Sequence, residues 1–271
     1  MAAALAEAGA EPLLLPMIDF ERAPDQALLS AALDRLAAGE YGWLVISSIT
    51  TVRALKEVAA TRGVGLPALV PPGVRIATIG PSSRRVLEAE GLRVDLAPAG
   101  RQSAEGLVEL WAYADDAGAA GGDGAGITRV LIPQSNLAAP TLAEGLDARG
   151  WSVETVTAYS TVDYPANPER RLVTSLAAGE QAGQEARAVV LSPDEANDEL
   201  AAGSLDAILA ASPSAARRIH DVLHPLEKTR LIAIGEPTAA ELERLGIPAA
   251  TTASAPSPAG IVDAIARSLN P

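Results

Sequence analysis

Short apolar runs alternate with amphipathic stretches along most of the chain. The runs have the length of buried strands, and apolar residues at helical spacing follow most of them. This alternation is typical of βαβ units, in which helices cover a parallel sheet. The clearest candidate strands are residues 43–47, 75–80, 129–133, 188–192, 206–212 and 230–235. The pattern therefore predicts an α/β fold built on parallel sheets.

An internal repeat indicates that this fold occurs twice. Two segments share one order of features: strand, Gly, Ser or Thr, helix, Gly, short strand, Ser and helix. Gly80 closes the first strand of one copy, and Gly235 closes that of the other. Gly91 and Gly246 follow at the same offset. Because the match keeps its register through a whole unit, we expect two related lobes of the Rossmann or flavodoxin-like class.

The first residues depart from this scheme. They predict a helix at about 2–8, a stop at Gly9 and a strand at 13–15, with no strand before the helix. A βαβ unit normally starts with a strand. We expect that the sequence starts inside this helix, and that the sheet beside 13–15 has an unpaired edge or a neighbour shifted to cover the gap.

Two polar stretches separate the candidate elements. Residues 115–126 are rich in Gly and Ala without apolar periodicity, which predicts a mobile surface loop. Residues 163–171 carry two prolines and several charges, which suits a crossing between lobes.

Composition excludes several classes of partner. A formal charge of −13 opposes nucleic-acid binding, which needs clustered Lys and Arg, and only 3% of the residues are aromatic. No stretch has the roughly 18 apolar residues of a membrane span, and residues 1–10 hold Glu7 without a basic start. We therefore expect a cytoplasmic protein that binds neither nucleic acid nor membrane.

The chain offers little metal chemistry. It has no Cys, and its two histidines, His220 and His224, stand four residues apart. Such a pair could hold a metal, but no acidic cluster with metal-site spacing accompanies it. A surface helix explains the pair better, so we expect no metal and no cofactor.

Small hydroxyl residues recur where strands end and helices begin. Gly allows close approach of the backbone, and Ser or Thr caps a helix whose first N–H groups attract anions. Capping alone also explains any one of them. Their occurrence at equivalent places in both copies favours a shared ligand site at the carboxyl ends of the strands. These positions are Ser48, Gly80, Ser82, Ser83, Ser212, Ser214 and Thr238.

A further turn and a tyrosine follow the candidate strand 129–133. Gln134, Ser135 and Asn136 form the turn, and a later strand carries Tyr159. Packing explains a tyrosine on a half-buried strand, although its phenol can also donate a hydrogen bond in chemistry.

Several motifs together resemble the uroporphyrinogen-III synthase family. They are "VISSITTV", the turns "ATIG" and "AIGEPTA", the L-x-x-x-L-x-x-x-G-x-x-V…Y-x-T pattern of residues 142–161, and "ASPSA". The similarity covers about residues 5–269. Each motif is weak, but their order and spacing are specific.

The resemblance implies two α/β lobes joined by a two-stranded connector, with the active site in the cleft between them. Residues 1–17 and 164–271 would form lobe one, and 18–163 lobe two. Tyr159 matches the family's tyrosine and is the implied catalytic residue. The implied substrate-binding residues are Ser48, Gly80, Ser82, Ser83, Ser135, Asn136, Ser212, Ser214 and Thr238.

The resemblance also implies the reaction. A monomer would cyclise hydroxymethylbilane, a linear tetrapyrrole with eight carboxylates, to uroporphyrinogen III with inversion of ring D and loss of water. Helix N-termini would attract the carboxylates. Six arginines could add to this potential, although solvated helix faces also explain them: Arg84, Arg85, Arg101, Arg129, Arg217 and Arg218.

The sequence departs from the family pattern in three places. The first strand is missing, Gln134, Ser135 and Asn136 replace the usual Arg-Gly, and Ile49 replaces a Pro. Because of these departures, an alternative function remains open: a non-enzymatic, two-lobed binding or regulatory protein that has kept the synthase fold. A nucleotide-dependent α/β enzyme is a weaker alternative, because each Gly turn has one of the three glycines of a dinucleotide fingerprint.

Overall fold

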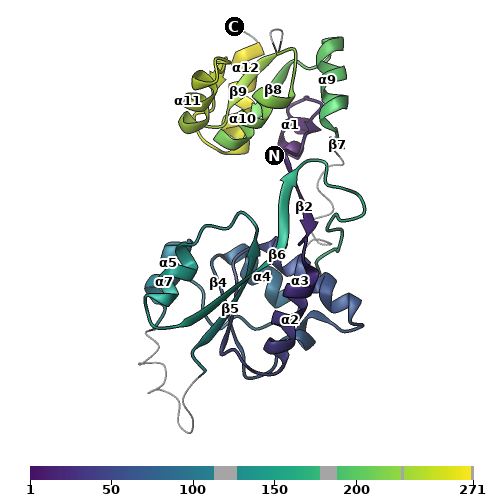
Figure 1. The fold of residues 1–271 in the computed structure, drawn as a ribbon. Coiled ribbons are helices and arrows are strands. Elements are labelled where there is room, and N and C mark those ends of the chain that lie inside the picture. Colours follow the sequence, from purple (N-terminus) through teal and green to yellow (C-terminus); the bar gives the residue numbers. More distant parts are fainter. Residues whose placement is uncertain (113–126, 178–187, 227–228, 270–271) are drawn as a thin grey trace. The chain divides into compact units, whose positions relative to one another are not determined.

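The computed structural model describes residues 1–112, 127–177, 188–226 and 229–269 (Figure 1). Their packing forms two compact units. Unit 1 holds residues 1–19, 163–165 and the described residues from 188 onward, and unit 2 holds 20–162 and 166–177 where these are described. The loop expected at 115–126 lies outside the described residues.

Unit 2 contains a five-stranded sheet in the order β2-β6-β5-β3-β4. β3 pairs in parallel with β4 and β5, and β5 pairs in parallel with β6. Every residue of β3 is buried, as expected for a strand covered on both faces. The strands are β2 (Ile18–Arg22), β3 (Trp43–Ile46), β4 (Arg75–Thr78), β5 (Arg129–Ser135) and β6 (Ser152–Asp163).

Helices cover both faces of this sheet, and alternate strand residues meet them. Ile46 and Leu131 pack in one core with α2 (Gln26–Ala37), α3 (Ile49–Thr61) and α4 (Pro81–Ala89). Val45 and Ile132 pack on the other face with α5 (Ala104–Leu110) and α7 (Thr141–Asp147), which lie side by side in Figure 1. A 3-10 turn, η1 (Leu66–Leu69), follows α3. These two cores confirm the α/β layering that the apolar periodicity predicts.

Unit 1 is also built on parallel strands. β8 (Ala207–Ala210), β9 (Arg230–Ala233) and β10 (Thr251–Thr252) form a sheet with β9 in the middle. β1 (Leu13–Leu14) pairs in parallel with β7 (Val189–Val190).

The helices of unit 1 lie against both sides of β9. Leu231 and Ala233 share a core with α9 (Pro193–Ala202), α10 (Pro213–Val222) and α11 (Glu236–Arg244). Ile232 packs instead with α12 (Pro258–Leu269), which also contacts α1 (Ala2–Glu7). No helix among the described residues combines the length and the apolar character that crossing a membrane requires.

The repeat is visible in the structure. Gly80 and Gly235 each follow a strand, have extended backbones and stand at the N-cap of a helix with Pro in its first turn. They belong to separate sheets in separate units, as the repeat predicts.

The start of the chain matches its predicted elements. α1, the stop at Gly9 (φ +89°) and β1 follow in the expected order. β1 pairs along one edge with β7, and Leu191 N donates a hydrogen bond of 2.8 Å to Leu14 O. The two strands form a sheet of their own, so within the described residues the other edge of β1 has no strand partner, which is the first of the two expected outcomes.

One segment differs from the division expected from the sequence. Residues 166–177 belong to unit 2, although the sequence assigned everything from 164 onward to the other lobe. Leu172 N donates to Phe20 O at 2.9 Å, and Leu172 and Leu176 are buried in a unit 2 core. Arg170 and Glu21 form an ion pair of 3.1 Å. These long-range contacts attach residues 166–177 to unit 2. The segment itself shows no apolar periodicity from which the contacts could have been predicted.

A polar cluster joins β6 to the segments beside it at the amino end of the unit 2 sheet. Tyr41 Oη donates to Glu154 Oε2 at 2.7 Å, Arg35 forms an ion pair with Glu154, and Arg129 reaches the same carboxylate at 3.2 Å. Burial opposes the charge of Glu154, but the hydrogen bonds from Tyr41 and Arg35 and the two guanidinium charges outweigh it. The pKa of Glu154 is therefore lowered from 4.5.

The first prediction concerns Gly42, which precedes β3. A Cβ at this position would lie 2.3 Å from the backbone oxygen of Ile127, so Gly42→Ala must displace backbone. We expect a loss of about 1–3 kcal/mol in the free energy of unfolding of unit 2. The three tryptophans of the chain are buried in that unit, so urea unfolding followed by tryptophan fluorescence measures it directly.

Gly73→Ala is the matched control, because no atom lies within 4 Å of its added Cβ. It should change the unfolding free energy by less than about 0.5 kcal/mol. Equal urea midpoints for the two variants would show that Ile127 does not restrict Gly42.

The second prediction concerns the charge of Glu154. Since its pKa is lower in the folded chain, its ionisation stabilises unit 2 fully above pH about 4.5, and this stabilisation is lost as the pH falls through the folded value. Glu154→Gln should therefore lower the unfolding free energy at pH 7 by about 1 kcal/mol or less, given the partial exposure of the pair. The difference should shrink below pH 4.

Glu88→Gln is the control, because it removes an exposed pair with Arg84 on α4. It should cost no more than about 0.5 kcal/mol. A Glu154→Gln effect that is the same at pH 7 and pH 3.5 would exclude a charge effect.

Candidate functional site

The carboxyl end of β3 brings together three hydroxyl groups. Ser48 is the N-cap of α3, and its Oγ accepts a hydrogen bond of 3.1 Å from Thr51 N. The same Oγ lies 3.0 Å from Thr51 Oγ1 and 3.1 Å from Tyr159 Oη. Ser48 and Tyr159 were both expected at the site, and the structure places them in direct contact although they are far apart in sequence.

Tyr159 is a buried residue whose hydroxyl group lies at a helix terminus. Only 6% of its surface is exposed, and its ring meets Phe20 edge-on with centroids 5.7 Å apart. Its Oη lies beside the first turn of α3, where backbone N–H groups give a positive potential. Packing therefore fixes the ring. The hydroxyl group belongs to a series of hydrogen-bonded hydroxyl groups that runs from Tyr159 through Ser48 to Thr51.

The second polar group of unit 2 lies at the end of β5. Asn136 Oδ1 accepts hydrogen bonds from Thr161 N at 2.9 Å and from Ser135 Oγ at 3.1 Å. Ser135 Oγ lies 3.0 Å from Thr161 Oγ1 and accepts a hydrogen bond of 3.1 Å from Leu137 N. Ser135 and Asn136 thus contact β6 just beyond Tyr159.

The end of β4 presents a helix terminus without a side-chain cap. Gly80 is the N-cap of α4, and no side chain accepts a hydrogen bond from the first turn there. Ser82 is exposed and Ser83 is buried. Thr78 Oγ1 donates to Ile46 O at 2.7 Å and fixes this end of β4 against β3. The terminus offers backbone N–H groups of the kind that bind carboxylates.

Unit 1 repeats this arrangement at its own strand ends. Ser212 caps α10 by accepting from Ala215 N at 3.1 Å, and its Oγ lies 3.0 Å from that of Ser214. Gly235 begins α11 without a side-chain cap, and Thr238 in the first turn is only 2% exposed. That these residues share one site with Ser48, Ser83 and Tyr159 stays a prediction.

Five of the six candidate arginines have carboxylate partners. Arg84 pairs with Glu88, Arg101 with Glu105 and Glu109, Arg129 with Glu40 and Glu154, Arg217 with Glu241, and Arg218 with Asp163. Hydrogen bonds from Arg244 and Arg217 lower the pKa of Glu241 to about 2. These pairs support the explanation of the arginines as surface residues, and they leave anion binding mainly to backbone N–H groups.

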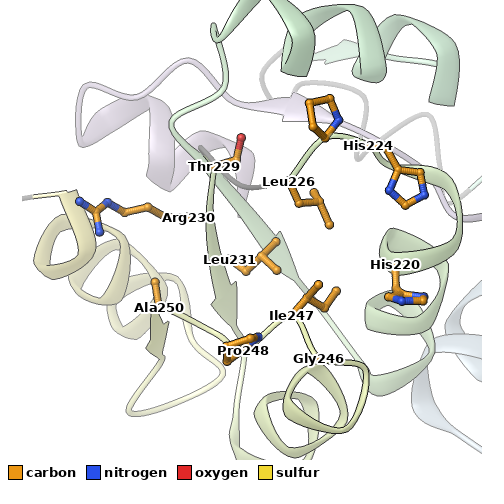
Figure 2. A pocket seen from close by; sticks show the side chains of 11 residues that line it. His220, His224, Leu226, Thr229, Arg230, Leu231, Gly246, Ile247, Pro248 and Ala250 are labelled. Atoms are coloured by element: carbon orange, nitrogen blue, oxygen red, sulfur yellow. The ribbon is translucent and has the colours of Figure 1, made fainter.

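A hollow of about 790 Å³ lies elsewhere in unit 1, at the amino end of β9 (Figure 2). Leu226, Leu231 and Ile247 point into it, and the rings of His220 and His224 lie along one side. The predicted binding residues of unit 1 follow the opposite ends of β8 and β9, so this hollow is separate from them. The sequence contained no signal for it.

The structure corrects the prediction of one surface helix for both histidines. α10 ends at Val222 and the backbone of Leu223 is extended, so His220 is helical and His224 is not. The two rings therefore do not share a helix face. Among the residues described, no group of three or more His, Asp or Glu is arranged to hold a metal ion.

Three contributors to the unit 2 site were missed in the sequence: Phe20, Thr51 and Thr161. Thr51 could have been noticed, because it is the third residue after Ser48 and lies in the first turn of the helix that Ser48 caps. Thr161 ends the Y-x-T motif but was assigned no role, and the contact of Phe20 with Tyr159 depends on how distant segments pack, for which the sequence had no local signal.

The chain is similar to known proteins in sequence and in fold. A curated relative from Methanothermobacter thermautotrophicus, named "Putative uroporphyrinogen-III synthase", is 24% identical over 253 residues, which is 90% of this chain and 84% of the relative. The crystal structure of a mutant uroporphyrinogen III synthase from the extremely thermophilic bacterium Thermus thermophilus matches with a TM-score of 0.52 and 16% identity, covering 99% of this chain and 93% of that one.

Uroporphyrinogen-III synthetase from Helicobacter pylori 26695 matches with a TM-score of 0.53 and 15% identity, covering 96% of this chain and all of that one. At such identities the two structures show a shared fold. A family model described as "Uroporphyrinogen-III synthase HemD" matches residues 1–263. With nearly the whole chain matched by that model, the protein belongs to the uroporphyrinogen-III synthase family.

Proposed function

We propose that this protein is a cyclising hydro-lyase that converts hydroxymethylbilane into uroporphyrinogen III. The family match over residues 1–263 supports the reaction. The observation in the structure that carries the proposal is the 3.1 Å contact between Tyr159 Oη and Ser48 Oγ at the carboxyl end of β3. It joins a proton donor to a helix terminus that attracts anions.

The reaction needs acid–base assistance and control of geometry. Loss of the hydroxyl group from the linear tetrapyrrole, as water, leaves an azafulvene cation. The ring D α carbon that already carries the methylene bridge to ring C attacks this cation and gives a spiro intermediate. The bond from this carbon to the ring C bridge then breaks, and the bridge carbon, now cationic, bonds to the other α carbon of ring D. Loss of a proton completes the macrocycle with ring D inverted. Substrate and product differ by one water, so the reaction involves no net oxidation or reduction.

Tyr159 is the proposed donor to the departing hydroxyl group. Ser48 Oγ accepts from Thr51 N and has one proton of its own. When Ser48 donates this proton toward Tyr159 Oη, the phenol proton can point to the substrate. A positioned proton donor of this kind contributes about 10² to 10⁴-fold in rate.

Helix termini would bind the carboxylates of the substrate. The N-terminus of α4 has no side-chain cap, and α3 begins next to Tyr159, so unit 2 offers backbone N–H groups near the proposed donor. In unit 1, α10 and α11 provide equivalent termini at Ser212 and Gly235, with Ser214 and Thr238 in their first turns. Partial charges at these termini attract anions without any formal charge, which suits a chain with a net charge of −13.

The larger contribution of the protein would be to hold the bilane curled, so that the substituted carbon meets the cation first. Uncatalysed closure gives the uninverted isomer I, and a well-oriented bound substrate can favour the other closure by many orders of magnitude. The monomeric state and the cytoplasmic location stay predictions from the sequence.

Incubation with enzymatically generated hydroxymethylbilane, followed by chromatographic separation of isomers I and III, tests the proposed function. We expect isomer III to be the main product and to form at a rate proportional to protein concentration. Formation of isomer I alone, at the rate seen without protein, would contradict the proposal and favour the non-enzymatic alternative.

The third prediction is that Tyr159→Phe lowers the rate of isomer III formation about tenfold or more. The variant keeps the ring that packs on Phe20 and deletes only the hydroxyl group. The measurement is the initial rate of isomer III formation under saturating substrate.

Tyr41→Phe is the matched control. It removes the hydroxyl group of another buried tyrosine of unit 2, which donates to Glu154 at the opposite end of the sheet. It should lower stability but leave turnover within about twofold. If Tyr159→Phe also turns over at the wild-type rate, Tyr159 has a packing role only.

A further inference from the structure

A register shift in β6 decides which face of the sheet Tyr159 occupies. From Arg129 to Gln134, β5 pairs with consecutive residues of β6, ending at Gln134 with Thr157. The next residue, Ser135, pairs with Tyr159, so Ala158 is an extra residue in β6. This irregularity is a β-bulge, a feature that redirects side chains.

Side-chain positions before and after the bulge show its effect. Val153 packs against the core with α5 and α7, whereas Val156 and Ala158 lie in the core with α2 and α3. Since strand residues alternate between faces, unbroken alternation would put Tyr159 on the face of Val153. Tyr159 instead shares the core of Val156 and Ala158, which is the face where Ser48 lies.

Ser135 and Asn136 hold β6 in this shifted register. Asn136 N donates to Tyr159 O at 3.1 Å, and Asn136 Oδ1 accepts from Thr161 N at 2.9 Å. The backbone and side chain of Asn136 thus continue the hydrogen bonding of the two strands beyond the end of β5. Two residues of β6 on the same side of the bulge, Tyr159 and Thr161, are fixed by this one asparagine.

The oxygen atoms of the Ser135 and Asn136 side chains already have partners inside the protein. Both acceptor positions of Asn136 Oδ1 are used, by Thr161 N and Ser135 Oγ. Ser135 Oγ donates its one proton to Asn136, accepts from Leu137 N and accepts a second hydrogen bond from Thr161 Oγ1. The Ser135 hydroxyl group and the Asn136 carbonyl therefore have no capacity left for substrate, and the Nδ2 group of Asn136 is the part of the two side chains that could still donate to a carboxylate.

We infer that Ser135 and Asn136 are positioning residues, which fix the bulge that turns Tyr159 toward Ser48. Binding of substrate by these two side chains was the expectation from the sequence, whereas the hydrogen bonds of Ser135 Oγ and Asn136 Oδ1 within the turn favour a positioning role. The expected effect of these residues on catalysis rests on the proposed function. Their expected effect on the position of the Tyr159 ring rests on geometry alone.

The fourth prediction compares two substitutions of Asn136. Asn136→Leu keeps the branching of the side chain at Cγ and removes the acceptor, whereas Asn136→Asp keeps both acceptor positions and adds a charge. We expect Asn136→Leu to lower kcat about tenfold with KM within about twofold. Asn136→Asp should keep kcat within about threefold and raise KM, because the new charge repels an anionic substrate. Initial rates of isomer III formation against substrate concentration give both constants.

Asn167→Leu is the matched control for loss of an asparagine acceptor. Asn167 Oδ1 also accepts from a backbone amide, Glu169 N, at 2.9 Å, but in the segment 166–177 of unit 2. This control should leave kcat and KM unchanged. If both Asn136 variants instead raise KM equally and keep kcat, Asn136 binds substrate through Nδ2 and the positioning role is wrong.

A second readout does not depend on activity. The chain has four tyrosines, so ¹³C-labelled tyrosine gives few ring signals, and Tyr159→Phe identifies the signal of Tyr159. Asn136→Leu should shift this signal and Asn136→Asp should leave it near its wild-type position. If the wild-type protein makes no isomer III, the proposed function is wrong. The shift of the Tyr159 ring signal in Asn136→Leu still tests whether Asn136 fixes the register of β6.

Ser135→Ala covers the case in which Asn136→Leu does not fold, as judged by tryptophan fluorescence. It removes the contact with Thr161 Oγ1 and keeps Asn136. A shifted Tyr159 signal with kcat lowered a few-fold would support the inference. An unmoved Tyr159 signal in a folded Asn136→Leu, or in Ser135→Ala where Asn136→Leu does not fold, would overturn it.

Discussion

The parallel pairing of β5 with β6 is the constraint on which the candidate site of unit 2 depends. A strand places successive side chains on opposite faces, so a register change by one residue moves a side chain to the other face of the sheet. β6 contains such a change at Ala158, directly before Tyr159. The ring of Tyr159 therefore packs beside Phe20, and its hydroxyl group reaches the helix that Ser48 caps.

The electrostatics of the site follow from the same arrangement of strand ends. The chain carries a formal charge of −13, and five of the six arginines that the sequence offered for anion binding are paired with carboxylates. What remains at the carboxyl ends of the strands are hydroxyl groups and backbone N–H groups. Both are neutral and fixed by the fold, so they can attract carboxylates without repelling the cation that forms during the proposed reaction.

Local signals were sufficient to predict the fold. The six candidate strands correspond to observed strands, since each is a compact apolar run followed by a helix, and the glycine repeat predicted that Gly80 and Gly235 belong to separate sheets. Ser48 was found because a cap residue is visible in sequence. Contacts between distant segments were not visible: residues 166–177 were assigned to the other unit, and the cluster of Arg35, Tyr41 and Glu154 was not anticipated. The bulge at Ala158 had no signal either, because a register exists only once two strands are paired.

The central claim is that the turn at Asn136 acts on catalysis through the direction of Tyr159. A double-mutant cycle on kcat, with Asn136→Leu and Tyr159→Phe alone and together, tests this claim most directly. If the turn acts through the phenol, Asn136→Leu should lower kcat about tenfold in the wild-type background and less than about twofold once Tyr159 is Phe. If Asn136→Leu lowers kcat by the same factor in both backgrounds, the two residues act independently and the account is contradicted.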